Sequence, residues 1–140
     1  MTQATDTIRT LVIERVMPHP PEKIWRALTE VPLLDEWLMK SDFQPIAGHK
    51  FNFRTEPSPH WNGIVDGEVL AIVPQEQLAY RWEASGLKTV VTWTLTPTEG
   101  GTHLRIEQSG FRPENTGSYE GAQFGWGRML DALERTLAQA

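Results

Sequence analysis

Cysteine is absent from the 140-residue sequence. This absence excludes disulfides, thiolate nucleophiles and metal sites held by cysteine, and it fits a reducing cytoplasm. Histidine is scarce too, and the four histidines show none of the paired spacings that hold a metal ion. The sequence therefore predicts no metal site.

Motifs for phosphate binding and for serine hydrolysis are missing as well. No glycine-rich loop has the spacing of nucleotide-binding proteins, and neither Ser109 nor Ser118 lies in a Gly-x-Ser-x-Gly motif. Positive charge is in the minority, since 13 Lys and Arg face 18 Asp and Glu and leave a net charge of -5. An acidic chain of this kind disfavours a general nucleic-acid-binding surface. We expect no cofactor and no nucleic-acid partner.

No stretch approaches the roughly 20 apolar residues that span a bilayer, and the polar N-terminus lacks the regions of a signal peptide. We expect a soluble cytoplasmic protein without a membrane partner, as a monomer or a homodimer. The length, with 39% hydrophobic and 22% charged residues, fits one globular domain. We place a tail at residues 1–7 and the domain at residues 8–140.

The spacing of apolar residues predicts an α+β fold. A strand is expected at residues 8–17, and apolar residues alternate again between residues 42 and 111, with a bulge or bend at Asp66 and Gly67. Helical spacing marks two short segments and one long one: residues 21–29, 31–39 and about 119–139. An antiparallel sheet of about six or seven strands needs a cover for its apolar face. Because only the last helix is long enough, we expect a helix-grip arrangement with a cleft between helix and sheet.

Aromatic side chains are the strongest candidates for that cleft, since the sequence has six tryptophans. Core packing is the ordinary explanation for such residues, but large rings with polar atoms also line ligand pockets. The expected lining consists of Trp37, Phe51, Phe53, Tyr80, Trp82, Trp93, Trp126, Met129 and Leu130. Gly121, Gly125 and Gly127 each weaken the first half of the last helix by about 1 kcal/mol relative to alanine, so we expect this half to open for ligand entry.

Two charged residues are candidate polar groups of the cavity. Arg15 shares a strand face with Leu11, Ile13 and Met17. It therefore binds a ligand anion, forms a salt bridge with a neighbouring strand, or lies on an outward face. Glu68 follows the Asp66–Gly67 break, so it either acts as a base in the cleft or lies outward in solvent.

Five stretches carry a resemblance that covers nearly the whole chain: residues 15–29, Leu34-Asp-Glu-Trp37, Asp66-Gly-Glu-Val69, residues 100–111, and Gly125-Trp126 with Leu130 and Leu133. In this order they resemble the Aha-type proteins, homologues of the ATPase activator of the ninety-kilodalton heat-shock protein. That family belongs to the START-like (Bet v-type, SRPBCC) superfamily. The resemblance implies a helix-grip fold and a cavity for a hydrophobic molecule, but it implies no catalytic residues.

Three functions remain open from the sequence. The first is a non-enzymatic protein that binds an apolar or aromatic small molecule. The second is an interaction module for a chaperone, as the family resemblance implies. The third is a cyclase-like enzyme on a polyketide-type substrate with Arg15, Glu68 or Tyr80 as polar catalysts. The lack of a dense cluster of titratable residues disfavours the enzyme, because proton transfer needs a positioned acid or base.

Overall fold

A computed structural model describes residues 8–59 and 61–139 of the chain. Within these residues, seven strands form one antiparallel sheet: β1 (Arg9–Met17), β2 (Lys40–Ser41), β3 (Lys50–Arg54), β4 (Ile64–Val73), β5 (Gln77–Ala84), β6 (Leu87–Thr98) and β7 (Gly101–Phe111). The strand order is β1-β7-β6-β5-β4-β3-β2. After β1, which lies at one edge, the chain therefore crosses to β2 at the opposite edge and returns strand by strand.

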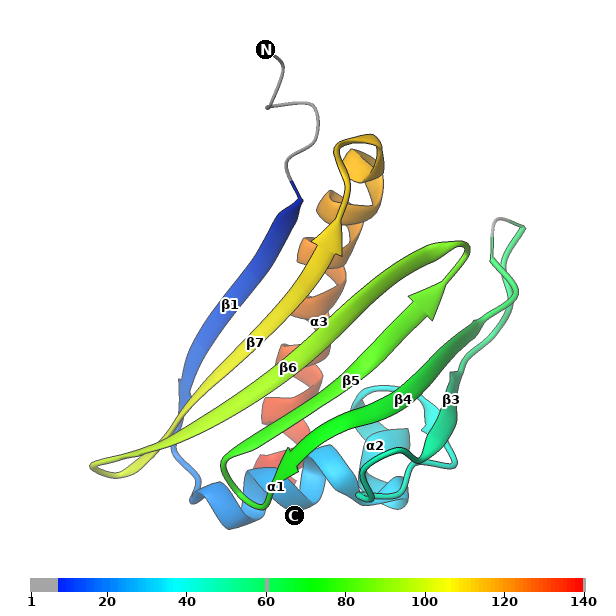
Figure 1. Cartoon of the computed structure of the whole chain (residues 1–140). Helices are drawn as coiled ribbons and strands as arrows, with labels where there is room; N and C mark the ends of the chain where they lie inside the picture. Colours follow the sequence, from blue (N-terminus) through cyan, green and yellow to red (C-terminus); the bar gives the residue numbers. More distant parts are fainter. Residues whose placement is uncertain (1–7, 60, 140) are drawn as a thin grey trace.

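Helices cover one face of this sheet (Figure 1). Their bounds are α1 (Pro21–Thr29), α2 (Val31–Trp37), the 3-10 helix η2 (Pro113–Asn115) and α3 (Thr116–Gln139). Pro21 begins α1 with a backbone angle that suits a first helical turn, and Glu22 adds negative charge where the helix dipole is positive. Helices α1 and α2 lie at one end of the sheet, and α3 runs behind the strands toward that end (Figure 1).

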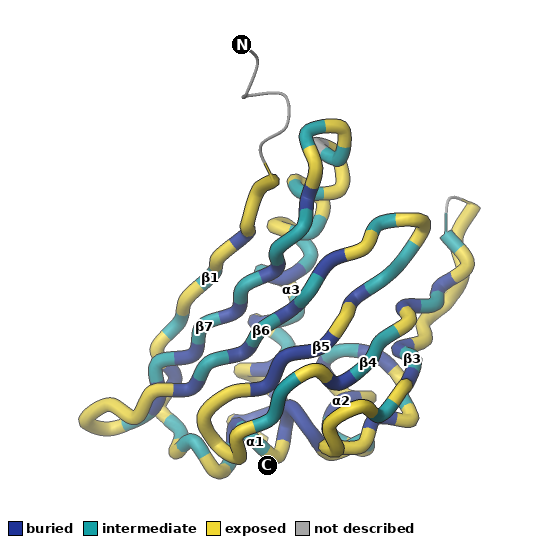
Figure 2. Tube along the Cα trace, in the orientation of Figure 1, coloured by how far each residue is buried: buried dark blue, intermediate teal, exposed yellow. Residues whose placement is uncertain are grey.

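Alternation along the strands fills the space under α3. Buried and half-buried positions alternate through much of β6 and β7, as Figure 2 shows. Trp93 of β6 pairs with Ile106 of β7, and both side chains are buried, whereas the flanking threonines of β6 lie on the other face. The expected α+β helix-grip fold is confirmed.

Gly67 shows where the local reading of the sequence was wrong. The β3–β4 register is regular through Gly67, and the register shift of β4 lies between Val69 and Ala71. A Cβ atom on Gly67 would lie 2.5 Å from Cζ of Phe51, the residue that pairs with it across the strands. Glycine is therefore present to let an aromatic ring approach the backbone, and the expected bulge or bend is absent at this position.

Other findings concern a short strand, the terminal segments and the length of the helices. The two-residue strand β2 was not predicted, because two residues show no alternation. Helix α3 begins three residues before the expected start at residue 119. The expected tail, residues 1–7, lies outside the described residues. Among the helices of the described chain, none is both long and apolar enough to cross a membrane.

Candidate functional site

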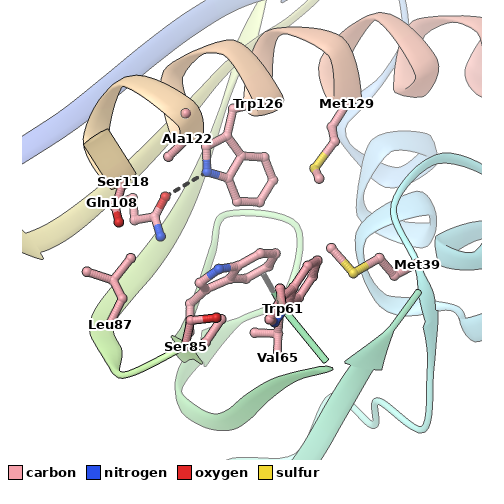
Figure 3. A pocket seen from close by; sticks show the side chains of 14 residues that line it. Met39, Trp61, Val65, Ser85, Leu87, Gln108, Ser118, Ala122, Trp126 and Met129 are labelled. Carbon is pink, nitrogen blue, oxygen red and sulfur yellow. Dashed lines mark hydrogen bonds between the residues drawn. The ribbon is translucent and has the colours of Figure 1, made fainter. Parts of the chain in front are cut away.

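A cavity of about 330 Å³ lies between the first half of α3 and the end of the sheet opposite α1 and α2 (Figure 3). Its walls come from α3, from strands β4 to β7 with the turn between β5 and β6, from the loop before β4, and from Met39 after α2. The described lining residues are Met39, Trp61, Val65, Trp82, Ala84, Ser85, Leu87, Gln108, Ser118, Gly121, Ala122, Gly125, Trp126 and Met129. The volume falls at the lower end of the range of small-molecule sites.

None of these described lining residues carries a charge. Trp61, Trp82 and Trp126 provide aromatic surface, and two methionines provide flexible apolar surface of the kind that adapts to ligand shape. Polar side chains at the wall are two serines and Gln108. A cavity of this composition suits an uncharged molecule with large apolar surface.

Trp126 forms the centre of the α3 wall and is held in place. Its ring centroid lies 5.0 Å from that of Trp82, with the two planes tilted by 54°. Its indole Nε1 donates a hydrogen bond of 2.8 Å to Oε1 of Gln108, the dashed line in Figure 3. Trp126 is 3% exposed, so the α3 wall of the cavity presents a buried ring with its polar atom already bonded.

Gln108 belongs to a buried chain of hydrogen bonds. Its Nε2 donates to Oγ1 of Thr89 at 2.9 Å, and Thr89 Oγ1 donates to the carbonyl oxygen of Trp82 at 2.8 Å. Because indole nitrogen can only donate, the atom of Gln108 that faces Trp126 must be the oxygen. The orientation of the amide is therefore determined by its partners.

Two glycines of α3 shape the same wall. Gly121 and Gly125 line the cavity, and a Cβ atom built on either would meet no atom within 4 Å. Gly127 lies one residue after Trp126, and its carbonyl oxygen accepts a hydrogen bond from Nη2 of Arg15 at 3.2 Å. The glycine-containing part of α3, residues 121–127, thus lies over the cavity, and it ends where Arg15 of β1 contacts α3.

The structure brings three of the nine expected lining residues to the cavity: Trp82, Trp126 and Met129. The other six do not line it, and they are 0–4% exposed in the packed core: Trp37, Phe51, Phe53, Tyr80, Trp93 and Leu130. Helices α1 and α2 lie at the other end of the sheet (Figure 1). There Trp37 donates to the Ala27 carbonyl oxygen at 2.8 Å, and Trp93 donates to the Tyr80 hydroxyl at 2.9 Å.

The expected polar residues are also placed elsewhere. Arg15 does face α3, but its Nη1 lies 2.7 Å from carboxylate oxygens of both Asp131 and Glu134. Glu68 pairs with Lys50 across β3 and β4. Its Oε1 lies 3.6 Å from Nε of Arg81, on the face of the sheet turned away from α3. Burial raises the pKa of Tyr80 far above its ordinary value, although the hydrogen bond from Trp93 acts in the opposite direction. The three candidate catalysts therefore lie in separate surroundings, and the structure does not assemble them.

Several lining residues were missed from the sequence. Trp61 lies outside the strands and helices, where periodicity carries no information about direction. Met39 lies just beyond α2, which ends at Trp37 and not at residue 39 as expected. Gln108, by contrast, left a signal: it continues the alternation of Leu104 and Ile106 and is 2% exposed. A polar residue at a core position of a strand marks a built hydrogen-bond network or a site.

The chain is similar to several solved structures. MLL2253 from Mesorhizobium loti is 49% identical, with a TM-score of 0.89 over 94% of this chain and 98% of that one. CV1439 from Chromobacterium violaceum is 26% identical, with a TM-score of 0.76 over 91% and 96% of the two chains. DynU16, a protein of the dynemicin biosynthetic locus, shares the fold at 24% identity and a TM-score of 0.77, over 92% of this chain and 47% of that one.

Among curated proteins, none matches the chain significantly. The sequence profile of the Activator of Hsp90 ATPase homolog 1-like protein family matches residues 18–138. This range extends from the end of β1 to the end of α3, so it includes both walls of the cavity. The chain belongs to the family of Activator of Hsp90 ATPase homolog 1-like proteins.

Proposed function

We propose that this protein binds an uncharged apolar or aromatic small molecule in the cavity between α3 and the sheet. The observation that carries the proposal is the lining itself: three tryptophans and two methionines surround the cavity, and none of the described lining residues is charged. A core of the same composition would be filled, as it is around Trp93, which is fully buried.

The expected affinity is modest. Burying about 200 Å² of ligand surface at about 25 cal/mol per Å² contributes about 5 kcal/mol before the cost of association. This contribution alone corresponds to a dissociation constant of about 0.2 mM or weaker for a small probe. Entry is expected through the first half of α3, where glycine lowers helix stability.

A cavity-filling variant tests this proposal. Isothermal titration with flavone, a fatty acid and 2-acetylnaphthalene should show binding of at least one aromatic probe to the unmodified protein. Ala122 lines the cavity, so Ala122→Leu should weaken that binding at least tenfold. Ala138 is exposed near the end of the same helix, so Ala138→Leu is the matched control and should leave the affinity unchanged.

Equal affinities of the two variants would place the ligand outside the cavity. Absence of binding by every probe would contradict the proposal and favour the chaperone-interaction function that the family name suggests. The cyclase-like alternative has less support, because Arg15, Glu68 and Tyr80 lie in three separate surroundings.

A further inference from the structure

Gln108 is a buried polar side chain in a wall that is otherwise mostly apolar. It is 2% exposed, and it lines the cavity beside Trp126 (Figure 3). Its hydrogen bonds to Trp126 and Thr89 fix which amide atom lies where. An amide in such a place costs free energy unless its polar atoms are used.

The amide has capacity that the protein does not use. An amide nitrogen carries two protons, and within residues 8–59 and 61–139 the only bond from Gln108 Nε2 goes to Thr89. The two N–H bonds of an amide point in different directions, so the hydroxyl oxygen that accepts one proton cannot accept the other. Buried N–H groups without an acceptor are rarer than carbonyl oxygens with a single partner. The unused N–H is therefore the feature that a ligand would complete.

We infer that the cavity takes a neutral aromatic molecule that bears a carbonyl oxygen, and that Gln108 Nε2 donates a hydrogen bond to this oxygen. The inference rests on the proposed function and adds the chemical class of the ligand. In this arrangement Trp82 and Trp126 offer aromatic surface to the rings of the ligand, and Gln108 donates to its carbonyl oxygen. A charged carboxylate is disfavoured, because no described lining residue offers a countercharge.

Two isosteric probes separate the hydrogen bond from the apolar contact. 2-Acetylnaphthalene and 2-isopropenylnaphthalene differ in shape only by the exchange of a carbonyl oxygen for a methylene group. We expect the ratio of their dissociation constants to favour the ketone by about fivefold to tenfold more in the unmodified protein than in Gln108→Met, the effect of one hydrogen bond. Thr89→Val is the control, since it also breaks the Gln108–Thr89 bond but keeps the amide, and it should keep the preference.

A second measurement does not depend on how the Gln108→Met variant folds. In the unmodified protein, the side-chain amide signals of Gln108 in a nitrogen–proton NMR spectrum should move downfield with the ketone and much less with the alkene. Binding of both probes with equal ratios in all variants, or equal shifts with both probes, would overturn the role of Gln108 while leaving the proposed function intact. Binding of neither probe would overturn both.

Discussion

Gly67 is a residue at which a single added carbon atom should be costly. Its position would place a Cβ atom 2.5 Å from Phe51, and that ring is itself enclosed, with Phe43 at 5.0 Å and Phe53 at 5.2 Å between centroids. The ring therefore has little room to move away. We predict that Gly67→Ala lowers the free energy of unfolding by about 1–3 kcal/mol in urea denaturation, as overpacking does elsewhere.

Gly127→Ala is the matched comparison, because a Cβ atom there meets nothing within 4 Å and the residue lies inside a helix. It should raise the free energy of unfolding by up to about 1 kcal/mol. A stabilising effect of Gly67→Ala would mean that Phe51 can shift without loss and that the close approach is not required.

His19 predicts a pH dependence of stability. Burial, and then the positive charge of Lys23, lower the pKa of His19, while Glu134 acts in the opposite direction. Between the folded and the unfolded pKa of His19, the unfolded chain binds more protons than the folded one. The contribution of His19 to the free energy of unfolding is therefore complete above about pH 6.5 and is lost as the pH falls below it. The fall in urea midpoint between about pH 7.5 and about pH 5.5 should be smaller in His19→Gln than in the unmodified protein. Identical falls would show that His19 does not contribute.

At the scale of elements, Arg15 joins β1 to the second half of α3. It contacts Asp131 and Glu134, whose side chains are 59% and 48% exposed, while Arg15 itself is 26% exposed. Because water screens such pairs, we predict that Arg15→Met lowers the free energy of unfolding by only about 1 kcal/mol. The difference should shrink in about 0.5 M salt, where screening acts within about 4 Å. A loss that is independent of salt would indicate packing of the arginine stem instead.

The two halves of α3 should differ in local stability. Gly117, Gly121, Gly125 and Gly127 lie in the first half, whereas the ion pairs and the buried Leu130, Leu133 and Leu137 lie in the second. We predict faster amide hydrogen exchange for residues 118–126 than for residues 129–137. Gly121→Ala with Gly125→Ala should slow exchange in the first half and weaken aromatic-probe binding by narrowing the cavity. Gly127→Ala, outside the lining, should slow exchange without weakening binding.

At the scale of the whole molecule, a chain of aromatic rings links the closed end of the fold to the cavity. Between ring centroids, Trp37 lies 5.8 Å from Trp93, Trp93 lies 5.5 Å from Trp126, and Trp126 lies 5.0 Å from Trp82. Trp37 and Trp93 belong to the packed core, whereas Trp126 and Trp82 line the cavity. The same type of residue therefore serves stability at one end and the candidate site at the other.

This division explains how far the sequence could predict the molecule. Alternation in residues 91–95 and 102–106 and the helical stripe of α3 follow from one-dimensional spacing, so the strands, the helix and their packing were predictable. The cavity remains at the end of the sheet that α1 and α2 do not cover. The spacing of apolar residues along the sequence gives no information about where these two helices pack. Phe53 and Trp82 thus look alike in sequence, although only Trp82 reaches the cavity.

The methionines offer the most direct test of the central claim that a small molecule binds between α3 and the sheet. The chain has four methionines; Met39 and Met129 line the cavity, whereas Met17 is fully buried elsewhere. In protein labelled at the methionine methyl groups, titration with 2-acetylnaphthalene should shift the NMR signals of Met39 and Met129 and give proton contacts from both to the probe. The signal of Met17 should stay in place. Unchanged Met39 and Met129 signals at saturating probe, or an equal shift of Met17, would contradict binding in this cavity.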